Sequence, residues 1–361
     1  MRCALARAAV LARVGFWTAA AAVTLARAAA AEPDWSPGWE EGLKEAAERA
    51  CPIIMVAPFK GGTLKPGIFP EVFNDPDVIK LSELCVCFYA DDRRYPKLDT
   101  VYAARFVRSS AGKYGTLQVI FCKTDGTEVE KLRLSGDAPK EKVVAGMRAL
   151  LKDYPAAVPR PQYLPCKALL VRARVLHSLE AYGESVETYE QLARVKSELR
   201  FVKDAGNAAG LLREEAARKV EDAAKELSAD DPQRRAEAMM KLHVYSRGMK
   251  GLDCHSRVRE LLSQAQKDPG LRSAFNAAEK SARAFELVVK GEVAFLDGRY
   301  KDAARLYGRV EREFRDSRYI ERAKERLKEL SEKLAPAKEP EQATPCRCIG
   351  ASDAVDKETD P

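Results

Sequence analysis

The longest pattern in the chain is helical, and it excludes a sheet for nearly half of the sequence. From Cys166 to Leu334 apolar residues recur about every 3.6 residues, and strand signals are almost absent. Turns that contain Gly or Asp-Pro interrupt this pattern at 182–184, 230–232, 250–253 and 268–270. Because short breaks join antiparallel helices, residues 166–334 are predicted to form an all-α domain.

In the preceding part of the chain, helical patterns alternate with short apolar runs that are typical of buried strands. A helix near Trp39–Ala50 precedes a first predicted strand, Pro52–Phe59. Asp75-Pro76 then begins a short helix before a second predicted strand, Leu84–Ala90. The remaining elements are predicted as a helix at 98–107, strands at 116–122 and 128–134 around Asp125-Gly126, and a helix at 140–151. Residues 32–152 are therefore predicted to form an α/β domain.

A chain of 361 residues is long enough for about two such domains. Four prolines between residues 153 and 165 predict an extended, stiff linker, and we place the domain boundary there. Residues 335–361 hold few large apolar side chains and are predicted to be disordered.

The first 31 residues have the layout of a secretory leader. Basic residues precede an apolar run, Val14–Leu25, and small residues follow before Glu32. The run is shorter than the roughly 20 residues that span a bilayer, so a cleaved leader is preferred to a retained anchor. We expect an exported protein, periplasmic or secreted, with no integral membrane segment after cleavage.

Charge gives no argument for nucleic-acid binding. The formal net charge is +7, and residues 1–31 contribute four arginines and no acid. The positive net charge of the remaining residues is small for a nucleic-acid-binding chain.

The order of elements in the first domain, together with several short motifs, resembles the thioredoxin superfamily over about residues 35–152. Trp35 and Trp39 precede the first helix, and Cys51-Pro52-Ile53-Ile54 opens the central strand. Val56-Ala57-Pro58-Phe59, then Phe69 and Val72–Ile79, are similar to the family's strand, redox loop and following helix. The resemblance implies a thioredoxin-like α/β fold.

The residues that perform redox chemistry in that family are absent here. The family's Cys-x-x-Cys position reads Gly62-Thr63-Leu64-Lys65, and no Cys lies between Cys51 and Cys85. Leu117 stands where the family has a cis-proline. We therefore expect a redox-inactive domain. An anion-binding nest at Gly61-Gly62, with Lys60 and Lys65, is an alternative use of this loop.

The other cysteines leave a weaker redox alternative. Cys85 and Cys87 face the same side of a predicted inner strand, where they are interpreted as core residues, although Cys85 could instead form a disulfide with Cys51. Cys346 and Cys348 lie in the predicted tail beside Arg347, where thiols would be exposed. Two thiols are too few for a closed zinc site.

Part of the helical domain resembles tetratricopeptide repeats. Between residues 291 and 324 the matching positions are Gly291, Gly298, Tyr300, Ala303, Tyr307 and Val310. A fainter copy between residues 168 and 196 has Ala173, Tyr182, Ser185, Tyr189 and Leu192. The resemblance implies stacked helical hairpins that bind a protein or peptide.

The sequence thus favours a non-catalytic protein-binding module without cofactor or metal. The alternatives are a thiol-disulfide oxidoreductase or redox sensor that uses Cys346 and Cys348, or Cys85 and Cys87, and a structural envelope component that assembles with itself. A Cys254-His255 pair offers two metal ligands, but a solvated helix end is the preferred interpretation.

Overall fold

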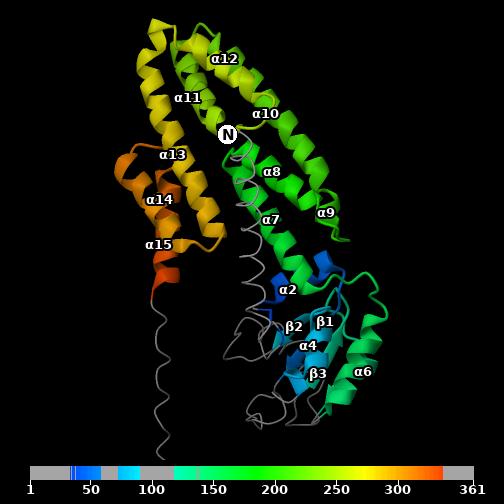
Figure 1. The fold of residues 1–361 in the computed structure, drawn as a ribbon. Helices are drawn as coiled ribbons and strands as arrows, with labels where there is room; N and C mark the ends of the chain where they lie inside the picture. The colour runs from blue at the N-terminus through cyan, green and yellow to red at the C-terminus, as the bar shows by residue number, and fades with distance from the viewer. Residues whose placement is uncertain are drawn as a thin grey trace, which may run out of the picture. The chain divides into compact units, whose positions relative to one another are not determined.

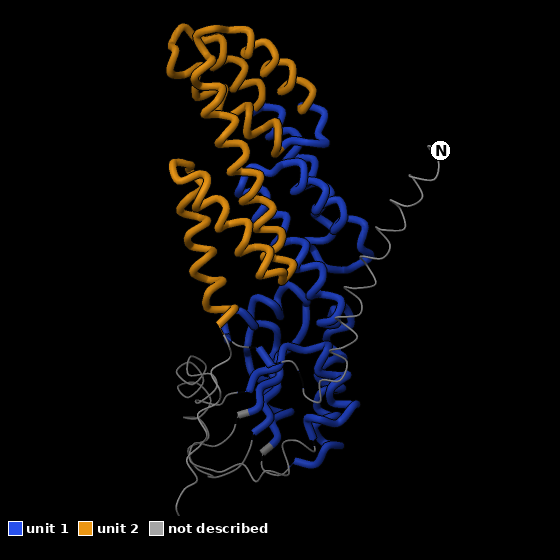
Figure 2. The backbone as a smooth tube through the Cα atoms, turned by 60° about the vertical axis from the view of Figure 1, so that its left-hand side comes forward, with its two compact units in different colours: residues 1–219, 249–254 blue, residues 220–248, 255–361 orange. Residues whose placement is uncertain are grey.

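The computed structural model describes residues 33–57 except 34 and 37, and residues 72–89, 118–135 and 138–335. Figure 2 shows that the backbone divides into two compact units. Unit 1 contains the described residues up to Lys219 together with Met249–Cys254, and unit 2 contains Val220–Gly248 and the described residues from His255 onward. The predicted leader and all but the first residue of the predicted tail lie outside the described residues.

A four-stranded mixed sheet forms the centre of the first part of unit 1 (Figure 1). The strand order is β2-β1-β3-β4; β1 is parallel to β2 and antiparallel to β3, and β3 is antiparallel to β4. The strands are β1 (Ile53–Ala57), β2 (Val86–Tyr89), β3 (Gln118–Cys122) and β4 (Leu134–Ser135).

Both faces of this sheet are buried, because successive side chains of β1 point to opposite sides. Ile54 and Val56 belong to one apolar cluster, whereas Ile53 and Met55 belong to the other. The first cluster includes residues of α4 (Pro76–Ser82) and α6 (Lys140–Leu151), and the second includes residues of α2 (Trp39–Arg49). The continuous apolar runs of the sequence therefore correspond to strands covered on both faces.

The predicted helix start at Asp75-Pro76 is confirmed. The Asp75 side chain accepts a hydrogen bond from the Asp77 backbone N–H at 2.9 Å, and Pro76 occupies the first turn. The predicted turn at Asp125-Gly126 is also present, with Gly126 in the left-handed region at φ 82°. The predicted helix at 98–107 lies outside the described residues.

The prediction of a continuous strand at residues 128–134, as the second strand of this hairpin, is wrong in the middle of the segment. Glu128 makes an isolated bridge to Cys122, a 3-10 turn, η3 (Glu130–Leu132), follows, and β4 contains two residues. A continuous strand would put Val129 on the opposite face from Leu132 and Leu134. The turn instead lets all three side chains pack against the same apolar cluster.

The predicted linker, residues 153–165, is helical in its second part. Helix α7 (Arg160–Ser178) begins with Pro161 in its first turn, where the missing N–H has no intrahelical partner to lose. Pro165 lies inside the helix and removes one hydrogen bond near its start. The compact units also divide near residue 219 and not at the predicted boundary.

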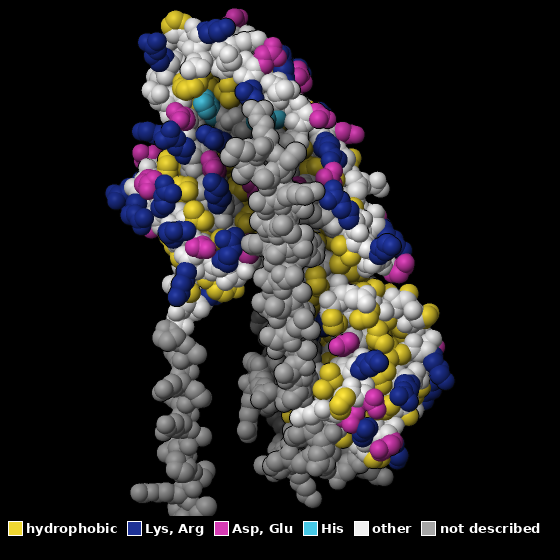
Figure 3. Space-filling view, in the orientation of Figure 1, with side chains coloured by type: hydrophobic (Ala, Val, Ile, Leu, Met, Phe, Trp, Pro, Cys, Tyr) yellow, Lys and Arg dark blue, Asp and Glu magenta, His cyan; other side chains and the backbone are white. Residues whose placement is uncertain are grey.

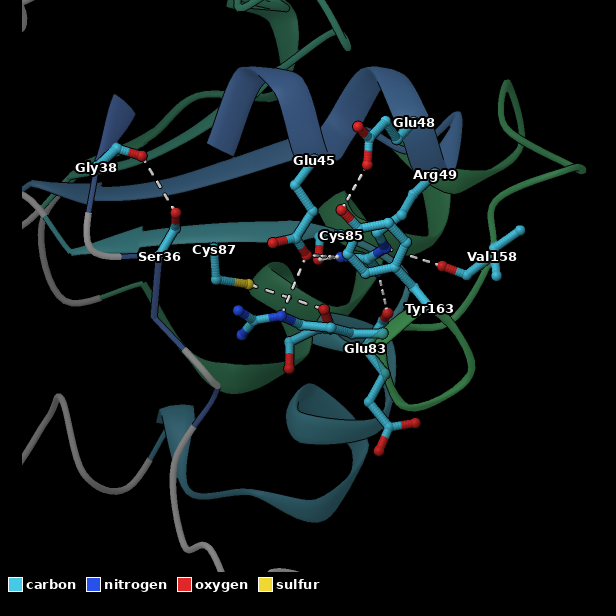
Figure 4. A network of polar contacts seen from close by, with 12 residues as sticks. Ser36, Gly38, Glu45, Glu48, Arg49, Glu83, Cys85, Cys87, Val158 and Tyr163 are labelled. Carbon is cyan, nitrogen blue, oxygen red and sulfur yellow. Dashed lines mark hydrogen bonds and ion pairs between the residues drawn. The ribbon is translucent and has the colours of Figure 1, made fainter. Parts of the chain in front are cut away.

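Arg49 attaches the beginning of α7 to the sheet, as Figure 4 shows. Its buried guanidinium donates hydrogen bonds to the backbone carbonyls of Val158 and Cys85, each at 3.0 Å, and to that of Glu83. It also forms an ion pair with Glu45 at 2.7 Å. The residues before α7 therefore do not behave as an independent linker.

The remaining described elements are helical. In unit 1, α7 packs against α8 (Tyr182–Ala193), followed by α9 (Arg200–Lys203) and the first part of α10 (Ala205–Leu227). Unit 2 continues α10 and adds α11 (Pro232–Gly248), α12 (His255–Ala265), η4 (Pro269–Leu271), α13 (Arg272–Leu296), α14 (Tyr300–Glu313) and α15 (Ile320–Leu334). No described helix is both long enough and apolar enough to cross a bilayer.

Candidate interaction surface and buried thiols

The predicted repeat positions in unit 2 meet in the hairpin formed by α13 and α14. Gly298 ends α13 at φ 73°, Tyr300 begins α14, and the Tyr300 ring lies 5.7 Å from the Phe295 ring. Ala303 and Tyr307 are fully buried. A Cβ atom added to Gly291 would lie 2.8 Å from a ring carbon of Tyr307. Glycine at 291 therefore allows the close approach of the tyrosine.

Replacing Gly291 by alanine is expected to destabilise unit 2 by about 1–3 kcal/mol, because the Tyr307 ring must move within a packed core. This effect opposes the gain of about 1 kcal/mol that alanine brings to a helix interior. The matched control is Gly308→Ala in α14, where a Cβ would meet only the flexible end of Arg312 at 3.3 Å. Urea unfolding measures the stability of both variants, and equal stability of Gly291→Ala and Gly308→Ala would contradict the expectation.

The fainter copy forms a similar hairpin from α7 and α8. Ala173, Tyr182 and Leu192 are almost completely buried, and Tyr189 is 8% exposed. Ser185, at the position where the repeat usually has alanine, is buried and donates a hydrogen bond to the Ala173 carbonyl at 2.8 Å. The hydroxyl is therefore satisfied without disturbing the helix contact.

The thiols near Arg49 are buried in the sheet region. Cys51, Cys85 and Cys87 are each at most 5% exposed, and all three are free. The structure therefore contains no Cys51–Cys85 disulfide. Burial raises the pKa of Cys51 to about 11 and that of Cys87 to about 12, and it raises the pKa of Cys85 well above its usual value. Thiols in this state are poor nucleophiles at neutral pH.

Iodoacetamide at pH 8 is expected to leave these three cysteines unmodified in the native protein, since a thiol of pKa 11 is only about 0.1% ionised there. In urea all three should react within minutes, because both burial and the raised pKa are lost. Mass spectrometry of tryptic peptides measures each site. Native alkylation of Cys85 or Cys87 at the unfolded rate would favour the redox alternative for this pair.

The other predicted redox positions are not described by the structure. Gly62, Thr63, Leu64, Lys65 and Leu117 lie outside the described residues, as do Cys346 and Cys348. The loss of the family's redox pair, the alternative nest and the tail cysteines therefore stay predictions from the sequence.

The described residues contain no cluster of three or more His, Cys, Asp or Glu side chains that could hold a metal. His255 contacts the Ser246 carbonyl at 3.1 Å, and the neighbouring Cys254 thiol lies 3.9 Å from the Met249 sulfur. His177 contacts Glu215 at 3.3 Å. Each of these groups has a local structural partner.

Charged side chains of both signs are interspersed over the helices of unit 2 (Figure 3). On α13, Glu279 pairs with Arg283 and Glu286 with Lys290, each at 2.6 Å and four residues apart. These contacts support the helix by a few tenths of a kcal/mol each. These four residues therefore form charge pairs within the helix.

A different kind of surface lies on α7, and none of the candidate site residues predicted from the sequence belongs to it. Leu164 and Val171 are each 39% exposed, Ala168 between them is exposed, and Val175 is partly exposed. These positions are four, three and four residues apart, so they follow one side of the helix. We call these four residues the α7 stripe. Its signal in the sequence is that α7 has apolar residues on more than the side that packs against α8.

Comparison of the chain with protein-family models, curated proteins and solved structures finds no match.

Proposed function

We propose that this chain is an exported, non-catalytic protein-interaction module, in which a redox-inactive thioredoxin-like domain is joined to a helical platform that resembles tetratricopeptide repeats. The strand order β2-β1-β3-β4, with β1 parallel to β2 and β3 antiparallel to β1, supports the thioredoxin-like part. The buried, protonated thiols near Arg49 support its lack of redox activity. The paired helices with their buried small and aromatic residues support the repeat-like part.

The observation that carries the proposal is the α7 stripe. Single exposed apolar residues are ordinary on protein surfaces, but here three exposed apolar residues and one partly exposed residue follow one side of the same helix. Exposed apolar rows bordered by polar residues mark protein-binding sites. The stripe lies on the hairpin to which the sequence already assigned a binding role.

Site-specific photo-crosslinking tests this function in cells that produce the protein. A benzophenone amino acid at position 164 or 171 is expected to give a discrete adduct with another protein. The control position is Leu211 on α10, which is 65% exposed and lies in the same unit. Absence of adducts from the stripe, or the same adducts from position 211, would show that the proposed binding surface is wrong.

A further inference from the structure

The charge of α7 distinguishes this helix from the other long described helices. Between residues 160 and 178 the chain has three arginines and one lysine but no Asp or Glu. By contrast, two exposed bases of α13, Arg283 and Lys290, each pair with a glutamate four residues earlier on the same helix. The α7 stripe therefore lies on a helix that has basic residues but no acidic residue of its own.

Three basic side chains border the stripe. Because each residue turns a helix by about 100°, Lys167 and Arg174 lie along one edge of the stripe and Arg172 along the other. The Lys167 ammonium contacts both carboxylate oxygens of Glu48 at 2.6 Å, so its charge is balanced locally. Arg174 is exposed and makes no hydrogen bond or ion pair with any described residue. The border at Arg174 is the part available to an anionic partner.

The exposure of the stripe favours a protruding partner over a flat one. Leu164 and Val171 are 39% exposed, so most of each side chain is already covered by its neighbours. A ridge of side chains can reach such residues, whereas a flat bilayer surface meets the longer basic side chains first. From position 164 to position 175 the stripe is roughly 16 Å long, which matches about three turns of a second helix.

We propose that the α7 stripe binds an amphipathic helix of a partner protein that presents an apolar ridge with acidic residues beside it. The apolar ridge packs between Leu164, Ala168 and Val171, and an acidic side chain pairs with Arg174. Apolar burial supplies most of the affinity, and the charge pairing selects the partner and its orientation. This proposal rests on the proposed binding function and adds the chemistry of the partner.

The test uses two labelled synthetic helices of about 18 residues that share leucines at the spacing of the stripe. One carries glutamates beside the leucines and the other carries lysines at the same positions. Fluorescence anisotropy with the full chain is expected to show the acidic helix binding at least tenfold more tightly. The preference should decline as salt is added.

Two variants and two matched controls localise the binding. Arg174→Glu is expected to weaken binding of the acidic helix about tenfold and to improve binding of the basic helix. Val171→Asp is expected to weaken binding of both helices about tenfold or more. Arg218→Glu makes the same charge change on α10 at another exposed arginine of unit 1, and Leu211→Asp places the same acid at another exposed apolar residue; both controls should bind like the unchanged chain. Circular dichroism confirms that each variant is folded; Arg174→Glu changes only an exposed side chain, so it remains informative if Val171→Asp does not fold.

Three outcomes would overturn the proposal: equal binding of the two helices, no effect of Arg174→Glu on either helix, or binding of the chain to anionic phospholipid vesicles with no preference between the peptides. Photo-crosslinks from position 171 together with equal binding of both helices would leave the binding function standing and refute only the acidic partner. If position 171 gave no photo-crosslinks and the two helices also bound equally, the binding function itself would be refuted.

Discussion

Replacing Arg49 by methionine is expected to lower the free energy of unfolding of unit 1 by about 3–5 kcal/mol. The Arg49 side chain is completely buried and donates to three backbone carbonyls, two from the segment that contains Glu83 and Cys85 and one from Val158. Methionine fills much of the volume but leaves these carbonyls without a donor in the protein interior, where each unsatisfied group costs about 1–3 kcal/mol. It also removes one of the two basic partners of Glu45, the other being Arg160 at 3.1 Å.

Tryptophan fluorescence in urea measures this loss, because Trp35 and Trp39 both lie in the sheet region. The third tryptophan, Trp17, is replaced by phenylalanine in every version so that it does not contribute. Arg49→Lys tests the geometry, since a single ammonium cannot reach three carbonyls in different directions, and it should lose about 2 kcal/mol or more. Arg148→Met on α6 is the exposed control and should change stability by less than about 0.5 kcal/mol. A loss below about 1 kcal/mol for Arg49→Met would show that these hydrogen bonds are replaceable.

The role of Arg49 illustrates a limit of sequence reasoning. In the sequence it is one basic residue in the last turn of an amphipathic helix, where arginine is expected for the helix dipole alone. Its partners are backbone carbonyls 34 to 109 residues away, and every residue type has a backbone carbonyl. No residue pattern therefore identifies them, and the prolines of residues 153–165 predict an extended, stiff linker where these bonds attach α7 to the sheet.

Local patterns were informative where local physics decides the structure. Continuous apolar runs identified the strands at 52–59, 84–90 and 116–122 to within a few residues in the described part of each, and the helix at 140–151 was confirmed over its whole length. The strand at 128–134 failed because Val129 and Leu132 pack into the same cluster, which a period of two does not allow. That outcome depends on the shape of the core and not on the propensity of the segment.

The candidate site was predictable to different degrees. The small and aromatic positions of the repeat-like hairpin, such as Gly291 and Tyr307, follow a spacing that can be recognised in the sequence. The α7 stripe could not be recognised in this way, because a helix with two apolar sides is also typical of a buried helix. Only the packing of neighbouring helices shows that one of those sides has no described element covering it.

Replacing Glu292 by glutamine is expected to destabilise unit 2 by about 3 kcal/mol, because it breaks a buried charge network while leaving its cations in place. The Glu292 carboxylate is completely buried on α13 and accepts hydrogen bonds from the Nε atoms of Arg322 at 2.8 Å and Arg326 at 3.0 Å. Its second oxygen accepts from Nη2 of Arg326 at 2.8 Å. Glutamine has nearly the same shape, so the loss reports the charge and not a cavity.

The contribution of Glu292 should depend on pH in a defined direction. Burial opposes ionisation of this carboxyl, but the hydrogen bonds from Arg326 and Arg322 outweigh burial and lower its pKa below the ordinary value of 4.5. The unfolded chain therefore takes up this proton before the folded chain does, and the stabilisation is fully present above about pH 5.5. It should disappear as the pH falls below 4.5 and through the folded-state pKa.

Urea unfolding followed by far-UV circular dichroism at pH 7 and at a series of lower pH values measures the difference between the unchanged chain and Glu292→Gln. Hydrogen exchange with peptide resolution assigns the loss to α13, α14 and α15. The control is Glu321→Gln on α15, whose side chain is 75% exposed and pairs with Lys324 at 2.9 Å; an exposed pair contributes at most about 1 kcal/mol. The proposed role of the buried carboxylate, as the charge that holds α15 against α13, would be wrong in either of two cases. In the first, Glu292→Gln loses no more unfolding free energy than this control. In the second, the loss caused by Glu292→Gln grows as the pH falls. A difference that narrows with acid would establish Glu292 as that charge, because protonation then does to the unchanged chain what the substitution does at neutral pH.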